Sequence, residues 1–480
     1  MRVDMRIPAI VATLILAGGG CGGDEERPRL PLVVDVGGPK LAHPQLVFIY
    51  YANDLDARDG FVDYSRGLVA SSWLEAVGAE YGIGAGSVLA VVEKPTSSPA
   101  QIDDREIVDL LFAGLADGSL PAPTADTLYM FTFPNNHVTY GSSTACVEFR
   151  GYHDSARRNG VEVAYAVIPT CRDSSGVAVS RATTISHELI EAATDPFPGS
   201  NPGWQLRDLT SPWLAMGDEV ADLCVRGGDS GVVPVGEHQA QRSWSNAAAG
   251  AERDPCVPHR YGETYFNAVL DTKTILRIRP GYHRTIRLEG FATKDVDSWI
   301  LSVRPALEGT VTLTLGELTL EPGKSTTLDI TLPSSARVGV PVFSYVYSEL
   351  GAAANYQWHY LPVPVMAGEP CSTFTDCQSC TSRAGCGFCS SSGRCEAIGV
   401  SGSAESSCEG SSFATWAGSC PGLCENRSAS CTTCTAAPGC GWCAGGTPAC
   451  MEASHAYSHP EVGTCAYADW SIRSSYCPGS

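Results

Sequence analysis

The pattern of hydrophobic positions divides the chain into parts with different periodicities. Within residues 45–258, continuous apolar runs of strand length alternate with stretches whose apolar positions recur at helical spacing. The runs that indicate buried strands are 46–51, 88–93, 127–133 and 161–168, and the amphipathic stretches are 62–81 and 103–116. Because strands that are apolar throughout alternate with helices, we predict an α/β layer structure for this part and expect the chemistry here.

Residues 262–367 have a different pattern, in which short alternating runs are separated by Gly, Pro and Asp at regular intervals. These runs are 274–278, 284–288, 299–303, 309–315, 325–332 and 342–347. The period of two, without helical spacing, predicts an all-β part. The stretch LTLEPGKSTTLDITLPSSARVGV resembles the Ig-like sandwiches that are common in exported bacterial proteins. The resemblance implies an Ig-like β-sandwich with a structural or adhesive role.

Sixteen of the 21 cysteines form an internal repeat near the C-terminus. The two units, 371–420 and 424–477, have nearly the same cysteine spacing, with the cores CQSCTSRAGCGFC and CTTCTAAPGCGWC. Each unit has about 50 residues and few large aliphatic side chains, which is too small a core to fold without cross-links. Zinc is an alternative for paired CxxC, but eight cysteines per unit in an exported chain favour four disulfides. The units resemble the cysteine-rich plexin–semaphorin–integrin (PSI) module, which implies rigid spacers.

The first residues indicate how the chain leaves the cell. Residues 1–20 combine two arginines, an apolar run and small residues at the exit, which is the pattern of a secretory signal peptide. Cys21 follows directly and resembles the lipidated cysteine of bacterial lipoproteins, and 21–44 has the composition of a flexible linker. We therefore expect a lipoprotein of the outer membrane, cell surface or periplasm. The alternative is a plain signal peptide and a secreted protein.

The other cysteines and the net charge restrict the compartment and the partners. Cys146, Cys171, Cys224 and Cys256 are an even set within the α/β part, as disulfide pairing requires. The net charge of −20 argues against nucleic acid and against an anionic membrane surface as partners. No apolar run reaches 18 residues, so we expect membrane contact only through the lipid anchor. The expected partner is a peptide or protein substrate, or a component of the cell-surface matrix.

The segment SHELIE carries a metal-binding pattern. His187 and Glu191 are four residues apart, so they share one face of a helix, as two ligands of one ion must. Glu188 lies beside them, where a general base can reach a metal-bound water without occupying a coordination position. The composition gives about 0.03 chance matches to HExxE. A helix whose His and Glu are only structural is the alternative.

A second carboxylate pair follows in GDEVADLC. Glu219 and Asp222 lie three residues apart, just before a cysteine. Zinc sites of the Glu-ligand peptidase class take their third ligand from a later helix, and an Asp one turn further on supports the site. Glu219 therefore fits the ligand and Asp222 the residue that bonds back to His187, although the two roles could be exchanged.

Together these segments resemble the plant exordium, or phosphate-induced, proteins and their bacterial relatives. The likeness runs through SHELIEAATDP, Trp204 in NPGWQ, GDEVADLC, CVEFRGYH and a strand that ends in IPTC, and so spans about 45–258. It implies an α/β zincin-like metallopeptidase fold, with one Zn²⁺ per chain at His187, Glu191 and Glu219.

Two further residues belong to the candidate site. His153 in GYHD is a candidate catalytic residue, either as an oxyanion stabiliser or as a further ligand, and a purely structural histidine is the alternative. Asp195 in the TDP turn is either a structural residue or an acceptor behind the ligands.

The leading hypothesis is an exported, lipid-anchored, zinc-dependent hydrolase of the metallopeptidase type, with Glu188 as the general base. The rival is a non-catalytic cell-surface adhesion or matrix-binding protein with a structural metal site. One reason is the exordium likeness, because those relatives are associated with cell-wall growth. The other is that the C-terminal half consists of modules that act as binding domains or as spacers. The substitution Glu188→Gln separates the two, since it abolishes turnover only under the first hypothesis.

Overall fold

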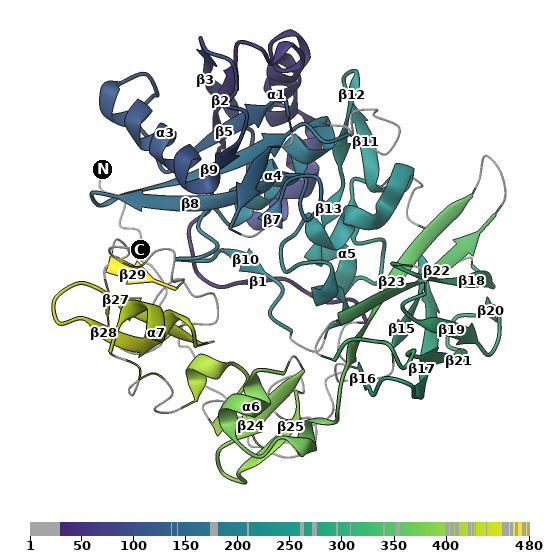
Figure 1. Ribbon diagram of the computed structural model, residues 1–480. Coiled ribbons are helices and arrows are strands. Elements are labelled where there is room, and N and C mark those ends of the chain that lie inside the picture. Colours follow the sequence, from purple (N-terminus) through teal and green to yellow (C-terminus); the bar gives the residue numbers. More distant parts are fainter. Residues whose placement is uncertain are drawn as a thin grey trace, which may run out of the picture.

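The computed structural model describes residues 29–480 apart from internal gaps (Figure 1). The gaps are 136, 142, 173–180, 209–210, 260–263, 271–275, 294–295, 308, 339–340, 352–355, 384, 399–402, 404–407, 409–411, 421–423, 425–426, 428, 438, 454–459, 461–463, 466–468, 473–476 and 478–480, and the side chains of 226–230 are also not described. The expected signal peptide and Cys21 lie outside the described residues. The structure confirms a mixed α/β part, then a β-rich part, then a disulfide-rich C-terminal part.

A five-stranded sheet is the centre of the α/β part (Figure 1). Its order is β3 (Ser87–Lys94), β2 (Gln45–Tyr51), β5 (Thr127–Phe133), β9 (Val161–Pro169) and β8 (Tyr152–Arg158). The first four strands are parallel, and β8 is an antiparallel edge strand. Every residue of β5 is buried, because both faces of the sheet are covered. The continuous apolar runs predicted from the sequence are therefore strands of this sheet.

Helices cover both faces of the sheet. On one face lie α1 (Val62–Val69), α2 (Ser72–Gly78) and α4 (Arg181–Thr194), and on the other lies α3 (Asp104–Asp117). The single helix expected over 62–81 is wrong. The chain is extended at Ser71, whose hydroxyl accepts a hydrogen bond from the backbone N–H of Leu74 and so starts α2 as a separate helix.

Short elements complete the α/β part. They are β1 (Val34–Asp35), η1 (Ala57–Phe61), η2 (Ala79–Tyr81), β4 (Ile102–Asp103), β6 (Val138–Tyr140), β7 (Ser143–Thr144), β10 (Trp204–Gln205), η3 (Pro212–Ala215), η4 (Asp222–Gly231), β11 (Val232–Val235), β12 (His238–Gln241), β13 (Ser243–Trp244), α5 (Asn246–Gly250) and β14 (Cys256–Val257). Disulfides join Cys146 to Cys171 and Cys224 to Cys256.

Residues 29–44, expected as part of a flexible linker, instead pack against the α/β part. Strand β1 pairs with β10, and Leu30, Val33 and Leu41 are buried in the core on the α4 side of the sheet. The side chain of Asn246 holds both backbone groups of Val33. These apolar side chains explain the difference, since each removes surface from water that a free linker would expose.

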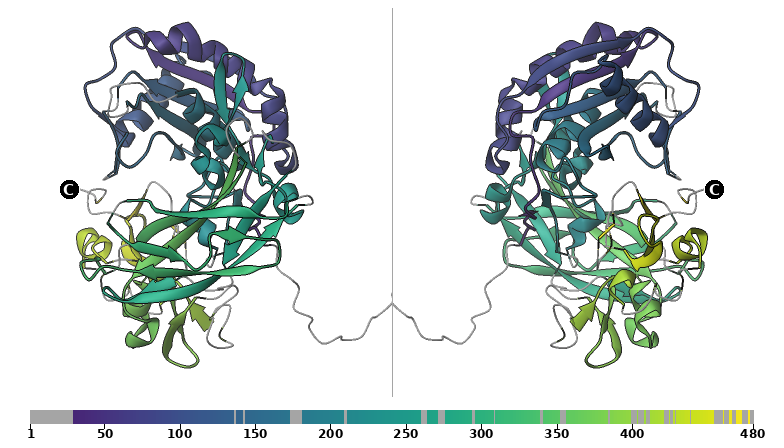
Figure 2. Two further views of the ribbon diagram at one scale, coloured as in Figure 1. Left: turned by 90° about the vertical axis from the view of Figure 1, so that its right-hand side faces the viewer. Right: turned by 90° about the vertical axis from the view of Figure 1, so that its left-hand side faces the viewer.

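The β-rich part has two sheets that enclose a core of their own (Figure 2). One sheet has the order β15 (Phe266–Leu270), β17 (His283–Ala292), β21 (Ser325–Thr331), β19 (Thr312–Leu315). The other has the order β16 (Leu276–Ile278), β23 (Gln357–Ala367), β22 (Pro341–Leu350), β18 (Trp299–Pro305), β20 (Thr319–Leu320). This part packs on the α/β part: the Tyr360 hydroxyl donates to the Leu223 carbonyl at 2.8 Å, and its ring lies 5.3 Å from that of Trp213.

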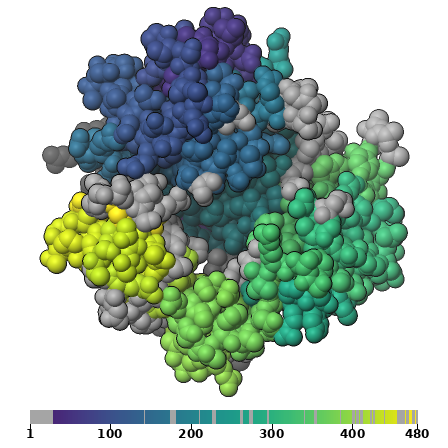
Figure 3. Space-filling model, viewed as in Figure 1, coloured from purple at the N-terminus to yellow at the C-terminus, as the bar shows by residue number. Residues whose placement is uncertain are grey.

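Two cysteine-rich repeats end the described chain, and they lie below the α/β part in the view of Figure 3. The first contains η6 (Cys371–Thr373), α6 (Cys377–Thr381), β24 (Cys386–Cys389), β25 (Arg394–Ala397), β26 (Phe413–Ala414) and η8 (Ala417–Ser419). The second contains α7 (Cys431–Thr435), β27 (Cys440–Cys443), β28 (Ala449–Glu452) and β29 (Trp470–Ser471). No helix of the described residues is long and apolar enough to cross a membrane.

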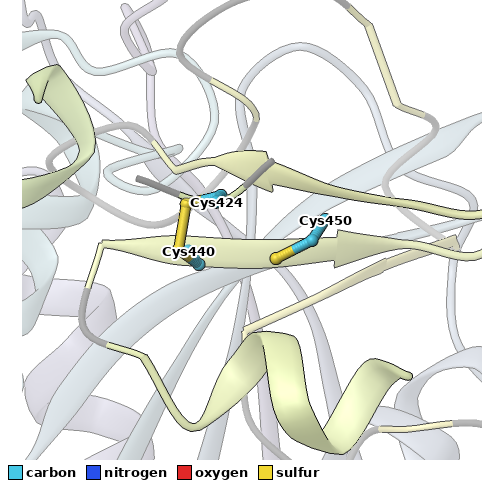
Figure 4. Close-up of side chains that lie close together, drawn as sticks. All are labelled: Cys424, Cys440 and Cys450. Carbon is cyan, nitrogen blue, oxygen red and sulfur yellow. A yellow bond between two sulfur atoms is a disulfide. The ribbon is translucent and has the colours of Figure 1, made fainter. Parts of the chain in front are cut away.

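All sixteen cysteines of the repeats are in disulfides, with the same connectivity in both units. Numbered within each unit, the first cysteine pairs with the fourth, the second with the eighth, the third with the sixth and the fifth with the seventh. Cys424, Cys440 and Cys450 have neighbouring sulfurs, but Cys424 is bonded to Cys440 and Cys450 to Cys434 (Figure 4). These sulfurs are therefore not thiolate ligands, and the zinc alternative for the repeats is wrong.

Candidate metal centre

Helix α4 carries three of the candidate residues and is nearly buried along its whole length. An ion pair fixes its first turn: the Arg181 guanidinium donates to both carboxylate oxygens of Asp54, at 2.8 and 2.7 Å, and both side chains are buried. Pro196 follows the helix and keeps Asp195 out of the α region. The helix is therefore held at a defined position on the sheet.

The structure brings together all the residues that the sequence assigns to the ligands and the base. His187 Nε2 lies 3.0 Å from Glu191 Oε2 on the same helix face. Glu188 joins these two in a group whose ligand atoms all lie within 4.8 Å of one another. Glu219, just before η4, and Asp222, the first residue of η4, also reach the cluster.

A hydrogen bond to Gln241 determines the orientation of His187. The Gln241 amide nitrogen donates to the Ala221 carbonyl at 2.7 Å, so its amide oxygen faces His187 Nδ1 at 3.1 Å. Nδ1 therefore carries a proton toward Gln241, and Nε2 faces Glu191 Oε2. Asp222, expected to bond back to His187 from behind, lies on this same side, with Oδ1 3.6 Å from Nε2. Sequence reasoning missed Gln241, because no motif marks it.

His153 enters the cluster from β8, the edge strand. Its Nε2 is 3.1 Å from the Asp195 carbonyl and 3.2 Å from Glu219 Oε1. Its Nδ1 is 3.5 Å from Glu188 Oε2 and 3.8 Å from Glu191 Oε2. The ring is thus surrounded by carboxylates, and its side chain is only 3% exposed.

Asp195 supports the cluster from behind, mainly through its backbone. Its carbonyl accepts from His153, while its carboxylate accepts from the backbone N–H of Gly203 at 2.8 Å and from the Gln205 amide at 2.7 Å. The carboxylate therefore anchors the loop that contains Trp204 and is not aimed at the ligands.

At two positions the backbone lies so close to a carboxylate of the cluster that only glycine fits. A Cβ on Gly151, in the GYH motif, would lie 2.8 Å from Glu188 Oε1 and 2.5 Å from a Thr184 methyl group. Gly217, in the GDE motif, has φ +137°, and a Cβ there would overlap with the Asp222 carboxylate. Larger residues at either position would displace Glu188 or Asp222.

Burial and mutual repulsion raise the pKa values of three acidic side chains in the cluster. Burial raises the pKa of Glu191 to about 7 and that of Asp222 to about 7, against the effect of His187. It raises the pKa of Glu219 to about 8, against the effect of His153. Burial lowers the pKa of both histidines, but the surrounding carboxylates outweigh it and hold both well above 6.5. The cluster therefore has a strong electrostatic demand for positive charge.

The residues present fit a divalent metal ion. The cluster offers imidazole nitrogen and carboxylate oxygen, which are ligands of zinc and of other first-row divalent ions. Glu219 Oε1 is buried and has no hydrogen-bond partner within the described part of the chain. His153 Nε2 lies 3.2 Å from this oxygen without a well-directed hydrogen bond, and a bound metal ion would satisfy the buried carboxylate.

The comparisons with known proteins do not identify a family for this chain. No family model matches the chain, and no curated protein matches it. Domains 4 and 5 of the S-layer protein SbsC are similar at 14% identity over 28% of this chain and 89% of that one, with a TM-score of 0.16. SbsC domains 1–6 match 45% of this chain and 24% of that one at 14% identity and TM-score 0.16. The GAE domain of yeast GGA1 matches 22% of this chain and 95% of that one, at 11% identity and TM-score 0.14.

Proposed function

We propose that the chain is an exported metal-dependent hydrolase of the peptidase type. The observation that carries the proposal is the pairing of His187 Nε2 with Glu191 Oε2, 3.0 Å apart on one helix, with the Glu188 carboxylate in the same group of atoms. Two ligands one turn apart with an acid between them are the arrangement of helix-borne zinc peptidase sites. For the third ligand the distances favour Asp222, which faces His187, over Glu219, which faces His153.

The chain's own residues have separate tasks in such a reaction. A bound divalent ion supplies Lewis acidity toward a carbonyl and makes a bound water more acidic. Glu188 accepts the proton of the attacking water and returns it to the leaving group. Gln241 holds His187 with Nε2 toward the ion, and Arg181 holds the helix that carries both histidine and base.

The other parts of the chain suit an exported protein. Ten disulfides in the described residues are typical of an oxidising, extracellular environment. Within the proposal, the α/β part is zincin-like, the β-rich part is an Ig-like sandwich, and the repeats are PSI-like spacers. Cys21 is the proposed point of lipid attachment at the outer membrane or cell surface.

One observation favours a second candidate, a structural metal site in an adhesion or matrix-binding protein. The side chains of Glu188 and Glu191 are 4% and 3% exposed, which restricts access of a large substrate to the base. His187 and Asp222 are more accessible, at 15% and 29%, so a substrate would have to approach from their side.

Glu188→Gln in the mature full-length protein tests the proposal. Buried Glu396, in the first repeat, supplies the matched control Glu396→Gln. Wild type and both variants are assayed for metal content and for cleavage of an unfolded protein substrate and a mixed peptide library. We expect equal metal content in all three and cleavage reduced at least 100-fold in Glu188→Gln alone. Equal metal content with no cleavage by wild type would support the structural candidate instead.

A further inference from the structure

The metal-ligating side chains of the cluster form two groups that share one residue. His187, Glu188 and Glu191 make one group, and His153, Glu191 and Glu219 make the other. Within each group the ligand atoms all lie within 4.8 Å of one another. The common residue is Glu191, whose Oε2 is 3.0 Å from His187 Nε2 and 3.8 Å from His153 Nδ1.

Each histidine is oriented independently, as a ligand to its own ion would be. His187 Nδ1 is committed to the Gln241 amide oxygen, and His153 Nε2 to the Asp195 carbonyl. The other nitrogen of each ring faces carboxylates of the cluster: His187 Nε2 is 3.0 Å from Glu191 Oε2, and His153 Nδ1 is 3.5 Å from Glu188 Oε2 and 3.8 Å from Glu191 Oε2. Glu219 Oε1 approaches the His153 ring from its Nε2 side, at 3.2 Å. A protein acceptor behind the ring, with the free nitrogen toward the ion, is the usual arrangement of metal-bound histidine.

The charge of the cluster exceeds what one divalent ion can balance. Glu188, Glu191, Glu219 and Asp222 carry four negative charges when ionised. Within the described residues, their ion pairs are all with the two histidines and none is with lysine or arginine. When both histidines are neutral, as metal-bound imidazoles are, one divalent ion balances two of these charges and two ions balance all four.

We propose that the centre is dinuclear, with Glu191 as the bridging ligand. One ion is held by His187, Glu191 and Asp222, as in the proposed function, on which this inference rests. The second is held by His153, Glu219 and the same Glu191 oxygen. His153 is then a metal ligand and not an oxyanion stabiliser. The donor set suits first-row divalent ions such as zinc, cobalt or manganese, and paired ions of this kind, about 3.5–4 Å apart, are common in hydrolases.

Metal stoichiometry tests the proposal without reference to activity. The mature full-length protein is stripped with a chelator, titrated with Zn²⁺, desalted and measured for bound metal by mass spectrometry. We expect two ions per chain in wild type, one in Glu219→Gln and fewer than one in Glu191→Gln. Asp104→Asn, which alters a partly buried carboxylate outside the cluster, is the control and should keep two. Circular dichroism and the melting temperature identify any variant that has not folded.

Cobalt substitution shows whether two ions are neighbours. Two Co²⁺ ions that share the Glu191 oxygen couple magnetically, so the electron paramagnetic resonance signal of the first equivalent should diminish when the second binds. Two independent, additive signals would overturn the proposal, since they indicate a remote adventitious ion. One ion in wild type would overturn it and leave the proposed function standing. No bound ion in wild type would overturn both, and two ions in Glu219→Gln would overturn the ligand assignment.

Discussion

Replacing Gln241 by leucine is expected to weaken metal binding without removing any ligand. The side chain makes two buried contacts, an amide oxygen with His187 Nδ1 at 3.1 Å and an amide nitrogen with the Ala221 carbonyl at 2.7 Å. Leucine fills a similar volume but supplies neither group. The His187 ring then loses the acceptor that fixes its tautomer and rotation, and the N–H that the acceptor satisfied is left unpaired.

The size of both effects follows from these contacts. Loss of the partner behind a metal-bound histidine reduces metal affinity about 10- to 100-fold, which corresponds to about 1.4–2.7 kcal/mol. In the metal-free protein, two buried polar groups lose their partners, for which we expect about 2–4 kcal/mol less stability toward unfolding. The first effect is specific to the site, whereas the second is expected for any buried amide.

Asn267→Leu separates the two effects. Asn267 is a fully buried amide in the β-rich part, and its nitrogen donates to the Tyr265 hydroxyl and the Tyr360 carbonyl. Isothermal titration of chelator-stripped protein with Zn²⁺, alongside denaturant unfolding, measures affinity and stability for wild type and both variants. We expect both variants to lose stability and only Gln241→Leu to lose affinity. Unchanged affinity in folded Gln241→Leu would refute the orienting role of Gln241.

Three further predictions concern stability. Burial lowers the pKa of His359 from about 6.5 to about 4. Between these pH values the unfolded chain binds a proton at this residue and the folded chain does not. Stability should fall by about 3 kcal/mol as the pH drops from 6.5 to 4, and denaturant unfolding of His359→Gln should show a shallower pH slope than wild type. Arg181→Met leaves the buried Asp54 carboxylate without its ion-pair partner and should cost about 3–5 kcal/mol in denaturant unfolding; a loss below 1 kcal/mol would contradict this. Removing the Cys224–Cys256 bridge, which closes a loop with a sequence separation of 32, by a double alanine substitution should cost about 4 kcal/mol of unfolding free energy, and unchanged thermal stability would contradict it.

The features that could be predicted from the sequence depend on local geometry. Strands buried on both faces are apolar at most positions, and so the run TLYMFTF indicates β5 without knowledge of its neighbours. The helical repeat likewise places His187 and Glu191 on one face from their spacing alone. The break at Ser71 was missed because helical spacing continues across it, while the local hydrogen bond of its hydroxyl decides the backbone.

The features that could not be predicted depend on contacts between distant segments. Gln241 meets His187 across 54 residues because the β11–β12 hairpin packs on α4, and a glutamine in a hairpin has no signature of its own. His153 could be marked as a candidate but not placed, since its position depends on which strand is the edge of the sheet. The disulfide connectivity of the repeats was also beyond reach, because eight cysteines allow about 105 pairings.

The cluster persists in a buried position because three of the segments around it are fixed by contacts outside the cluster. The buried Arg181–Asp54 pair holds the start of α4, and the Cys224–Cys256 disulfide holds the segment that carries Glu219 and Asp222. The Gln241 carbonyl accepts from the Trp73 indole at 2.7 Å, which fixes the end of β12 independently of its side chain. Four carboxylates held close together repel one another, and this repulsion cannot relax by movement of their backbones. A cation is then the most effective means of relieving it, so the rigidity of the surrounding fold becomes a source of metal affinity.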